Sequence, residues 1–95
     1  MAAYLYILEC GDGSFYVGST RNLELRVAQH CSGHGAAYTR RRQPVRLVYS
    51  CEFGSIDEAY AMEKRVQGWS RAKRQALIDG DFDLIRRLAR KPGFD

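Results

Sequence analysis

Two short segments rich in aromatic and β-branched residues lie on either side of a glycine-containing turn, Gly11–Gly13. The first segment covers Leu5–Glu9 and the second covers Phe15–Gly18. Residues of these types favour extended backbone, and a Gly-Asp-Gly connection is typical of a tight turn. The pattern therefore predicts a β-hairpin near the start of the chain, around which the rest of the fold has to be built.

The length of this turn decides which side chains share a face of the hairpin. A two-residue turn would pair Glu9 with Tyr16 and would place Tyr6 and Tyr16 on opposite faces. A three-residue turn, with Gly13 in the left-handed region, would pair Leu8 with Tyr16 and would put both tyrosines on one face. Both turns suit the sequence. We predict the three-residue form, because it brings the two tyrosines together without a bulge elsewhere.

Helix and strand signals then follow in a simple order. They predict a helix capped by Thr20 or Asn22 that runs to about Cys31, then a long loop over 31–44 and a strand over Val45–Phe53. The next helix starts with the capping box Ser55–Glu58 and runs to about Trp69. A helix between Ser70 and Gly80 and a short last helix over 81–90, which ends before Pro92, complete the order. The order ββαβααα predicts an α+β fold with a small three-stranded antiparallel sheet flanked by helices.

Length and composition are those of a single globular domain. The 95 residues leave no room for two hydrophobic cores. We expect neither a membrane span nor a secretion signal, because no long apolar run is present and the N-terminus lacks a charged segment. Three cysteines without a C-x-x-C pair favour a cytoplasmic protein over a disulfide scaffold. The 15 Lys and Arg against 11 Asp and Glu suit binding to nucleic acid, and equally suit simple solubility.

The expected helix Ser55–Trp69 carries a carboxylate where an amphipathic helix should be apolar. At about 100° per residue its apolar side chains form one broad face, and Glu63 falls inside that face. A buried carboxylate is costly unless it is paired or holds a cation. Two interpretations follow: a glutamate at the rim that bonds to an arginine, or a metal ligand or catalytic acid in a cleft.

The first expected helix adds a basic pair. Arg26 and His30 are four residues apart, so they lie on one helical face. Taken alone, the pair is best interpreted as a solvated polar face. Next to a buried glutamate it becomes a candidate phosphate clamp, because arginine offers a planar fork to phosphate oxygens and histidine moves a proton near neutral pH.

Together these residues resemble the motifs of the GIY-YIG nuclease superfamily, and most of all its small stand-alone bacterial members. LYIL is followed by YVG, and Tyr16 stands ten positions after Tyr6. The segments STRNLELRVAQH, GHGAAYTRRRQPVRLVY and AYAMEKRVQGW come next in the family order, and they contain Arg26, His30 and Glu63. Five motif elements in the same order and spacing are a specific match.

The resemblance implies a metal-dependent nuclease that acts on DNA, with a role in DNA repair or recombination. By position, Tyr6 would be the base for the attacking water, or its relay, and Tyr16 would help to hold water and phosphate. Arg26 would stabilise phosphate charge and His30 would assist proton movement. Glu63 would bind one divalent cation, Mg²⁺ or Mn²⁺, and no organic cofactor is expected.

The resemblance also sets domain boundaries and shows two departures from the family. It implies a GIY-YIG nuclease domain over residues 1–80, with a short C-terminal helix and tail of the same domain over 81–95. Tyr4 and Leu5 replace the glycine and isoleucine of the first motif, at strand positions that can accommodate a side chain. The asparagine that some members carry after the glutamate helix is absent. Either Gln75 replaces it or the role is missing.

A basic surface beside these residues is expected to contact nucleic acid. A strand-tracking loop is our interpretation of the arginine run, and a solubilising charge run is the alternative. The expected contacts are Tyr38, Arg40, Arg41, Arg42, Lys64 and Lys73.

With no further domain to grip a duplex, we expect single-stranded or splayed DNA to be preferred. Two other function classes remain: a nucleic-acid-binding module with weak or lost catalysis, and a partner-binding adaptor on a nuclease scaffold. The presence of all five candidate catalytic residues argues against both. The oligomeric state is left open.

Overall fold

A computed structural model of the chain describes residues 2–89. Within them, three strands and five helices follow one another as β1 (Ala3–Glu9), β2 (Phe15–Thr20), α1 (Leu23–Cys31), α2 (Ala37–Arg40), β3 (Arg46–Phe53), α3 (Ile56–Gln67), α4 (Arg71–Asp79) and α5 (Phe82–Ala89). No helix among these residues is long and apolar enough to cross a membrane.

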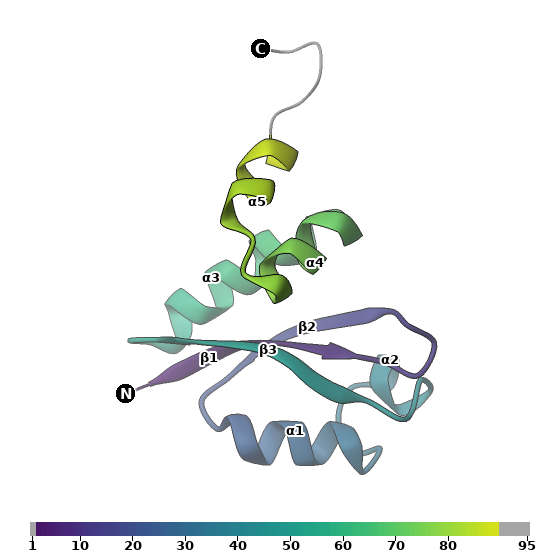
Figure 1. The fold of residues 1–95 in the computed structure, drawn as a ribbon. Helices are drawn as coiled ribbons and strands as arrows, with labels where there is room; N and C mark the ends of the chain where they lie inside the picture. The colour runs from purple at the N-terminus through teal and green to yellow at the C-terminus, as the bar shows by residue number, and fades with distance from the viewer. Residues whose placement is uncertain (1, 90–95) are drawn as a thin grey trace.

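The strands form one antiparallel sheet in the order β2-β1-β3, so the predicted α+β fold with a three-stranded antiparallel sheet is confirmed. Strand β1 lies in the middle of the sheet, with helices on both sides of it (Figure 1). Its successive side chains point to opposite faces, so they alternate between the two layers. Helix α1 covers one face of the sheet, while α3, α4 and α5 lie on the other side. Each face has its own apolar cluster.

The two clusters divide the buried side chains of β1 between them. On the side of α3 the cluster contains Leu5, Ile7, Phe15, Val17, Val66 and Leu77. On the side of α1 it contains Tyr6, Leu8, Cys10 and Val45, with Tyr16, Leu23 and Val27 packed against them. A polar hydroxyl, that of Tyr6, is therefore buried on the α1 face among apolar side chains.

The hairpin has the three-residue turn, as predicted. Leu8 pairs with Tyr16. The Gly13 N–H donates to the Cys10 carbonyl at 2.9 Å, and the Cys10 N–H donates to the Ser14 carbonyl at 2.8 Å. Gly13 has φ of 84°, in the left-handed region that glycine adopts without strain. This register places the side chains of both hairpin tyrosines on the α1 face.

The expected helix caps are also present. Asn22 begins α1 by accepting a hydrogen bond from the Leu25 N–H, and Ser55 and Ser70 begin α3 and α4 in the same way. Gly80 ends α4 in the left-handed conformation. These side-chain oxygens satisfy backbone N–H groups that the first turn of a helix leaves unpaired.

The loop expected over residues 31–44 is different, because it contains the short helix α2. The Gln43 side-chain amide donates to the backbone carbonyls of His30 and Thr39, at 2.7 and 2.8 Å, and so ties α2 to the end of α1. Four residues are too few to show a helical period, so the sequence pattern did not predict α2. The expected tail beyond residue 89 lies outside the described residues.

Candidate active site

Two buried polar side chains meet beneath the hairpin. The Tyr6 hydroxyl lies 3.0 Å from Nε2 of His30, and both side chains are almost completely buried, at 1% and 0% exposure. The ring of Tyr16 packs beside them, with its centroid 5.0 Å from that of His30 and 6.4 Å from that of Tyr6. Strands β1 and β2 and helix α1 therefore bring three of the five candidate catalytic residues together.

The hydrogen bonds around His30 select one tautomer of its ring. The Thr39 hydroxyl donates to the Ala36 carbonyl at 3.0 Å and lies 2.7 Å from His30 Nδ1. A hydroxyl has one proton, so all contacts are satisfied when His30 Nδ1–H donates to the Thr39 oxygen. His30 Nε2 is then unprotonated and accepts the proton of the Tyr6 hydroxyl. This series of hydrogen bonds, from Thr39 through His30 to Tyr6, thus directs the Tyr6 proton towards His30 Nε2.

Two glycines make room for this pair. A Cβ on Gly18 would lie 2.4 Å from the Tyr6 hydroxyl oxygen, and a Cβ on Gly35 would lie 2.4 Å from Nδ1 of His30. Any side chain at either position would collide with the buried rings. The glycine after Tyr16 and Val17 in the sequence is therefore required by close packing against the first tyrosine.

Burial and charge set the protonation of the site. Burial raises the pKa of Tyr6 to about 12, Arg26 opposes this rise, and the negative charge of Glu63 adds to it. Burial, together with the nearby Arg26 charge, lowers the pKa of His30 to about 4. At neutral pH the site therefore contains a phenol and a neutral imidazole, beside a permanent cation. Arg26 Nη1 donates to Gln29 at 3.1 Å and is only partly buried, so it can also contact a ligand.

Glu63 approaches from the other side of β2. Its Oε1 accepts a 2.6 Å hydrogen bond from the Ser19 hydroxyl, and its Oε2 accepts a 2.8 Å bond from the Gln67 amide. The Gln67 amide is itself fixed by the Val17 carbonyl at 3.3 Å. The interpretation of a rim glutamate bonded to an arginine is wrong: serine and glutamine hold this carboxylate, and its ion pair is with Lys64 at 3.7 Å.

This carboxylate suits a cation that needs few protein ligands. Its side chain is 12% exposed, and each oxygen accepts one neutral hydrogen bond that leaves a lone pair for a metal. Within residues 2–89 no group of three or more His, Cys, Asp or Glu side chains could hold a metal. A single carboxylate fits Mg²⁺, which keeps several waters and takes further oxygen ligands from a substrate phosphate. It does not fit an ion that demands a complete protein cage.

The expected nucleic-acid contacts divide into exposed and internally bonded residues. Arg40 and Arg41 are exposed at the end of α2. Arg42 instead forms an ion pair with Asp12 at 3.1 Å and donates to the Tyr38 carbonyl. Its guanidinium also lies 3.8 Å from the centroid of the Tyr38 ring. Arg42 therefore joins the hairpin turn to α2, and the part of the basic run that is free for a ligand is smaller than the sequence implies.

The remaining predicted residues lie on α3 and α4. Lys64 is exposed beside Glu63, and Lys73 packs its ammonium 4.4 Å from the centroid of the Trp69 ring. Gln75, the candidate replacement for the family asparagine, is exposed and donates to Asp79. The structure therefore does not bring Gln75 to Glu63. The amide that bonds to Glu63 is instead that of Gln67, one helical turn later.

Three residues of this site were not found from the sequence. Ser19, Thr39 and Gln67 contact the candidate catalytic side chains through tertiary hydrogen bonds. Gln67 had a usable signal, because a residue four positions after Glu63 lies on the same helical face. Ser19 and Thr39 had no such signal, because the local pattern of a strand or a loop does not show which residue of another element lies beside it.

The comparison with known proteins agrees with this geometry. A family model described as the GIY-YIG catalytic domain matches residues 2–76. The chain therefore belongs to the GIY-YIG family, whose domains are of nuclease type. The resemblance identified from the motifs is confirmed.

The relatives are small proteins of similar length, from bacteria and archaea. The UPF0213 protein BH0048 of Halalkalibacterium halodurans is 47% identical over 92 residues, which are 94% of this chain and 98% of that protein. A UPF0213 protein of Natronomonas pharaonis is 45% identical over 79% of this chain and 88% of its own length. The solution NMR structure of BH0048 superimposes with a TM-score of 0.55, at 41% identity, over 96% of this chain and all of that one.

A second solution NMR structure, that of the protein EF2693 from E. faecalis, has a TM-score of 0.58 at 37% identity. It covers 88% of each chain. The fold described above is therefore that of solved relatives.

Proposed function

We propose that this chain is a divalent-metal-dependent endonuclease that hydrolyses phosphodiester bonds in DNA. The observation that carries the proposal is the bond from the Tyr6 hydroxyl to an unprotonated His30 Nε2, since it gives a buried tyrosine a place to send its proton. A phenol whose pKa is raised to about 12 is a poor base by itself at neutral pH. When it is bonded to the His30 imidazole, the phenol can accept a proton from a water while it gives its own proton to the ring.

Tyr6 acts as a relay for the attacking water. Its oxygen accepts a proton from the water while its own proton passes to Nε2 of His30, so the phenol is regenerated and the imidazole becomes an imidazolium. Nδ1–H of that imidazolium stays bonded to the Thr39 oxygen. The hydroxide so formed attacks phosphorus as the bond to the leaving oxygen breaks. The leaving oxygen takes a proton from solvent water, and His30 returns its extra proton to solvent through Tyr6, which restores the neutral imidazole.

Arg26 and Glu63 have complementary roles in charge stabilisation. Arg26 lies on the same face of α1 as His30, and its positive charge acts to lower the pKa of both Tyr6 and His30. A phosphate bound to Arg26 would be placed beside the Tyr6 oxygen, and the negative charge would favour the proton on His30. Glu63 would hold Mg²⁺ or Mn²⁺, which stabilises charge on the phosphate and the leaving oxygen when bound.

The preferred substrate in this proposal is single-stranded or splayed DNA. The five candidate catalytic residues come from β1, β2, α1 and α3, so the scissile phosphate has to reach the outer edge of β2. A flexible strand can bend there, whereas a stiff duplex has to be deformed at a cost of several kcal/mol. A cytoplasmic role in DNA repair or recombination is included in the proposal, and the three cysteines, which are free thiols, suit that compartment.

The test is cleavage of one end-labelled strand, alone and annealed to its complement, at equal salt with Mg²⁺, Mn²⁺ or EDTA. We expect metal-dependent cutting that is faster on the single strand. Tyr6→Phe, purified in parallel, keeps the buried ring, lacks the hydroxyl and controls for contaminating nucleases. The proposal is wrong if the wild-type protein cuts neither substrate, or if Tyr6→Phe cuts as fast. A duplex cut as fast as the strand contradicts the substrate preference alone.

A further inference from the structure

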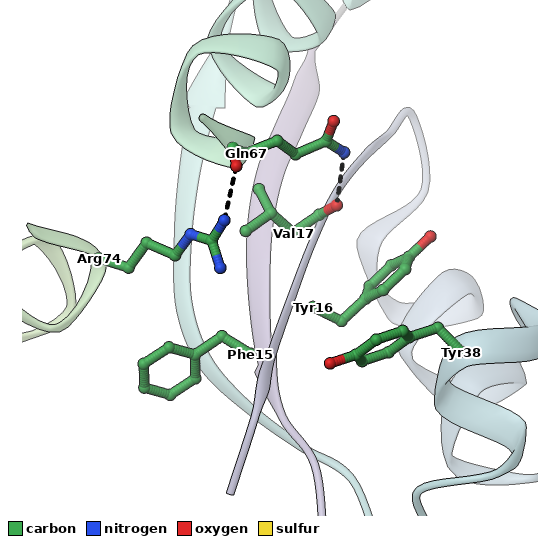
Figure 2. A pocket seen from close by; sticks show the side chains of 6 residues that line it. All are labelled: Phe15, Tyr16, Val17, Tyr38, Gln67 and Arg74. Atoms are coloured by element: carbon green, nitrogen blue, oxygen red, sulfur yellow. Dashed lines mark hydrogen bonds between the residues drawn. The ribbon is translucent and has the colours of Figure 1, made fainter. Parts of the chain in front are cut away.

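An open cavity of about 270 Å³ lies on the outer edge of β2, beside the active site (Figure 2). Strand β2 contributes three consecutive residues to it, α2 contributes one aromatic ring, and the end of α3 and the start of α4 close the other side. The lining residues are Phe15, Tyr16, Val17, Tyr38, Gln67 and Arg74.

One wall of this edge pocket is aromatic and is shared with the active site. The rings of Tyr16 and Tyr38 lie 5.9 Å apart between centroids, tilted by 34°. Tyr16 also contacts His30, so a group that enters the pocket lies next to the candidate catalytic cluster. Tyr38 is 37% exposed, and Arg42 holds its ring in place from the end of α2. The wall is therefore preformed and presents planar surfaces to a ligand.

The opposite wall is polar and equally fixed. Arg74 donates through Nε to the Val66 carbonyl at 3.1 Å and through Nη2 to the Gln67 carbonyl at 2.6 Å, which fixes the orientation of its guanidinium (Figure 2). The Gln67 amide nitrogen is occupied by Val17 and Glu63, as described above. Polar groups at set positions beside aromatic rings are what a flat, hydrogen-bonding ligand requires.

The positive charges around the pocket favour a ligand that is part of a polyanion. None of the six lining residues is a carboxylate. Besides Arg74, the Arg71 guanidinium lies 4.2 Å from the centroid of the Phe15 ring at its rim. An uncharged ligand would gain nothing from these cations, whereas a nucleotide carries its phosphates past them while its flat base enters between the rings.

We propose that the edge pocket receives one unpaired nucleobase, from the nucleotide next to the scissile phosphate. The inference rests on the proposed nuclease function and names the feature of the substrate that the site recognises. A base in a duplex is stacked and paired, and cannot turn into a pocket at the edge of a strand without the cost of extrusion. The pocket therefore supplies a contact to single strands, through Tyr38 and Tyr16, that a duplex lacks.

The test measures binding in EDTA, so that no strand is cut and no metal contributes. The probes are a short fluorescent oligothymidylate and an abasic strand with the same number of phosphates, compared by fluorescence anisotropy. Loss of a stacked base should weaken binding roughly 5- to 150-fold in the wild-type protein. In NMR spectra, the base-bearing strand should shift the Val17 backbone amide and the Gln67 side-chain amide more than the abasic strand does.

Variants of Tyr38 locate the effect. Tyr38→Leu should bind the two strands with a clearly smaller difference in affinity, because only the Tyr16 ring is left to stack on the base, while Tyr38→Trp, which keeps a ring, should keep the full difference. Phe82→Ala is the matched control, because Phe82 is an aromatic residue on α5 that is 57% exposed and does not line the pocket. Thermal melts of all variants show whether each one is folded.

The outcomes separate this inference from the proposed function. Equal wild-type affinity for both strands, or a preference for bases that is undiminished in folded Tyr38→Leu, overturns the base pocket. If the wild-type protein still cuts single strands in Mg²⁺ in that case, the nuclease proposal stands. If it cuts nothing and binds neither strand, both proposals fail.

Discussion

The Tyr6 hydroxyl and Nε2 of His30 are 3.0 Å apart, although the residues are separated by 24 positions in the sequence. One lies on the middle strand and the other at the end of α1, so the bond joins the sheet to the helix that covers it. Both groups are buried, and a buried polar group without a partner costs about 1–3 kcal/mol. The bond therefore contributes to the packing of α1 as well as to the proposed chemistry.

Thr39 should act through His30. In Thr39→Val the shape is nearly kept, but Nδ1–H of His30 loses its acceptor, and the ring is free to adopt the other tautomer. We expect a loss of about 1–3 kcal/mol in the free energy of unfolding and a fall in cleavage rate of roughly tenfold or more. Urea melts and single-turnover cleavage measure the two effects. Thr39→Ser, which keeps the hydroxyl, should stay close to wild type, and a fully active valine variant would contradict the tautomer assignment.

His30 should make stability depend on pH in the acid range. Its folded pKa of about 4 lies below the ordinary 6.5, so between these values the unfolded chain binds more protons than the folded one. The contribution is complete above pH 6.5 and is lost as the pH falls towards 4, by at most about 3 kcal/mol. Urea melts across this range should therefore show a steeper loss in wild type than in His30→Gln. Parallel curves would show that folding does not lower the pKa of His30.

Gly18 should be intolerant of a methyl group. In Gly18→Ala the new Cβ would lie 2.4 Å from the Tyr6 hydroxyl oxygen, so the ring has to move. Overpacking of this kind typically costs about 1–3 kcal/mol, and a displaced hydroxyl should reduce cleavage further than stability alone explains. Gly68→Ala is the control, since its Cβ would meet nothing closer than the Arg65 carbonyl at 3.5 Å. Equal activity of the two folded variants would refute the close-packing argument.

Glu63→Gln should leave the protein folded and abolish metal-dependent cleavage. The amide keeps the size of the side chain and can still accept from the Ser19 hydroxyl, but it removes the charge that attracts a divalent cation. A thermal melt and a cleavage titration with Mg²⁺ and Mn²⁺ test both halves. Cutting at the wild-type rate would exclude Glu63 as the metal ligand.

The arginine run should separate into two kinds of residue. Replacing exposed Arg40 and Arg41 by glutamine should weaken DNA binding and reduce the slope of log affinity against log salt by roughly 0.7–0.9 for each phosphate that the variant no longer neutralises. Arg42→Gln should instead lower stability, because it breaks the contacts to Asp12 and Tyr38. Binding measured over a salt series, with melts of each variant, distinguishes them. An unchanged slope after replacement of Arg40 and Arg41 would identify a merely solvated surface.

Local signals in the sequence predicted most of the secondary structure and the family. The turn residues of the hairpin, the caps Asn22, Ser55 and Ser70, and the stop at Gly80 act within a few residues of where they stand, so they can be recognised without a fold. The placement of Glu63 inside an apolar face was visible for the same reason.

Tertiary contacts account for what the sequence did not show. Helix α2 is held by the Gln43 side chain and by packing around His30, which no local pattern encodes. The partners of Glu63 come from two elements, and Ser19 is 44 positions away. Arg42 appeared to be one of three equivalent basic residues, and its ion pair with Asp12 depends on the return of the chain to the hairpin turn.

The central position of β1 has a consequence for how the backbone exchanges its amide hydrogens. Tyr6 pairs with β2 on one side and β3 on the other, and its strand is buried on both faces, so its amide should exchange with solvent only when the whole sheet opens. Helix α2, with four residues and an exposed outer face, can open locally. The proposed proton relay therefore begins in the best protected part of the described chain, while its far end, Thr39, belongs to a helix whose local opening would break the hydrogen bond to His30.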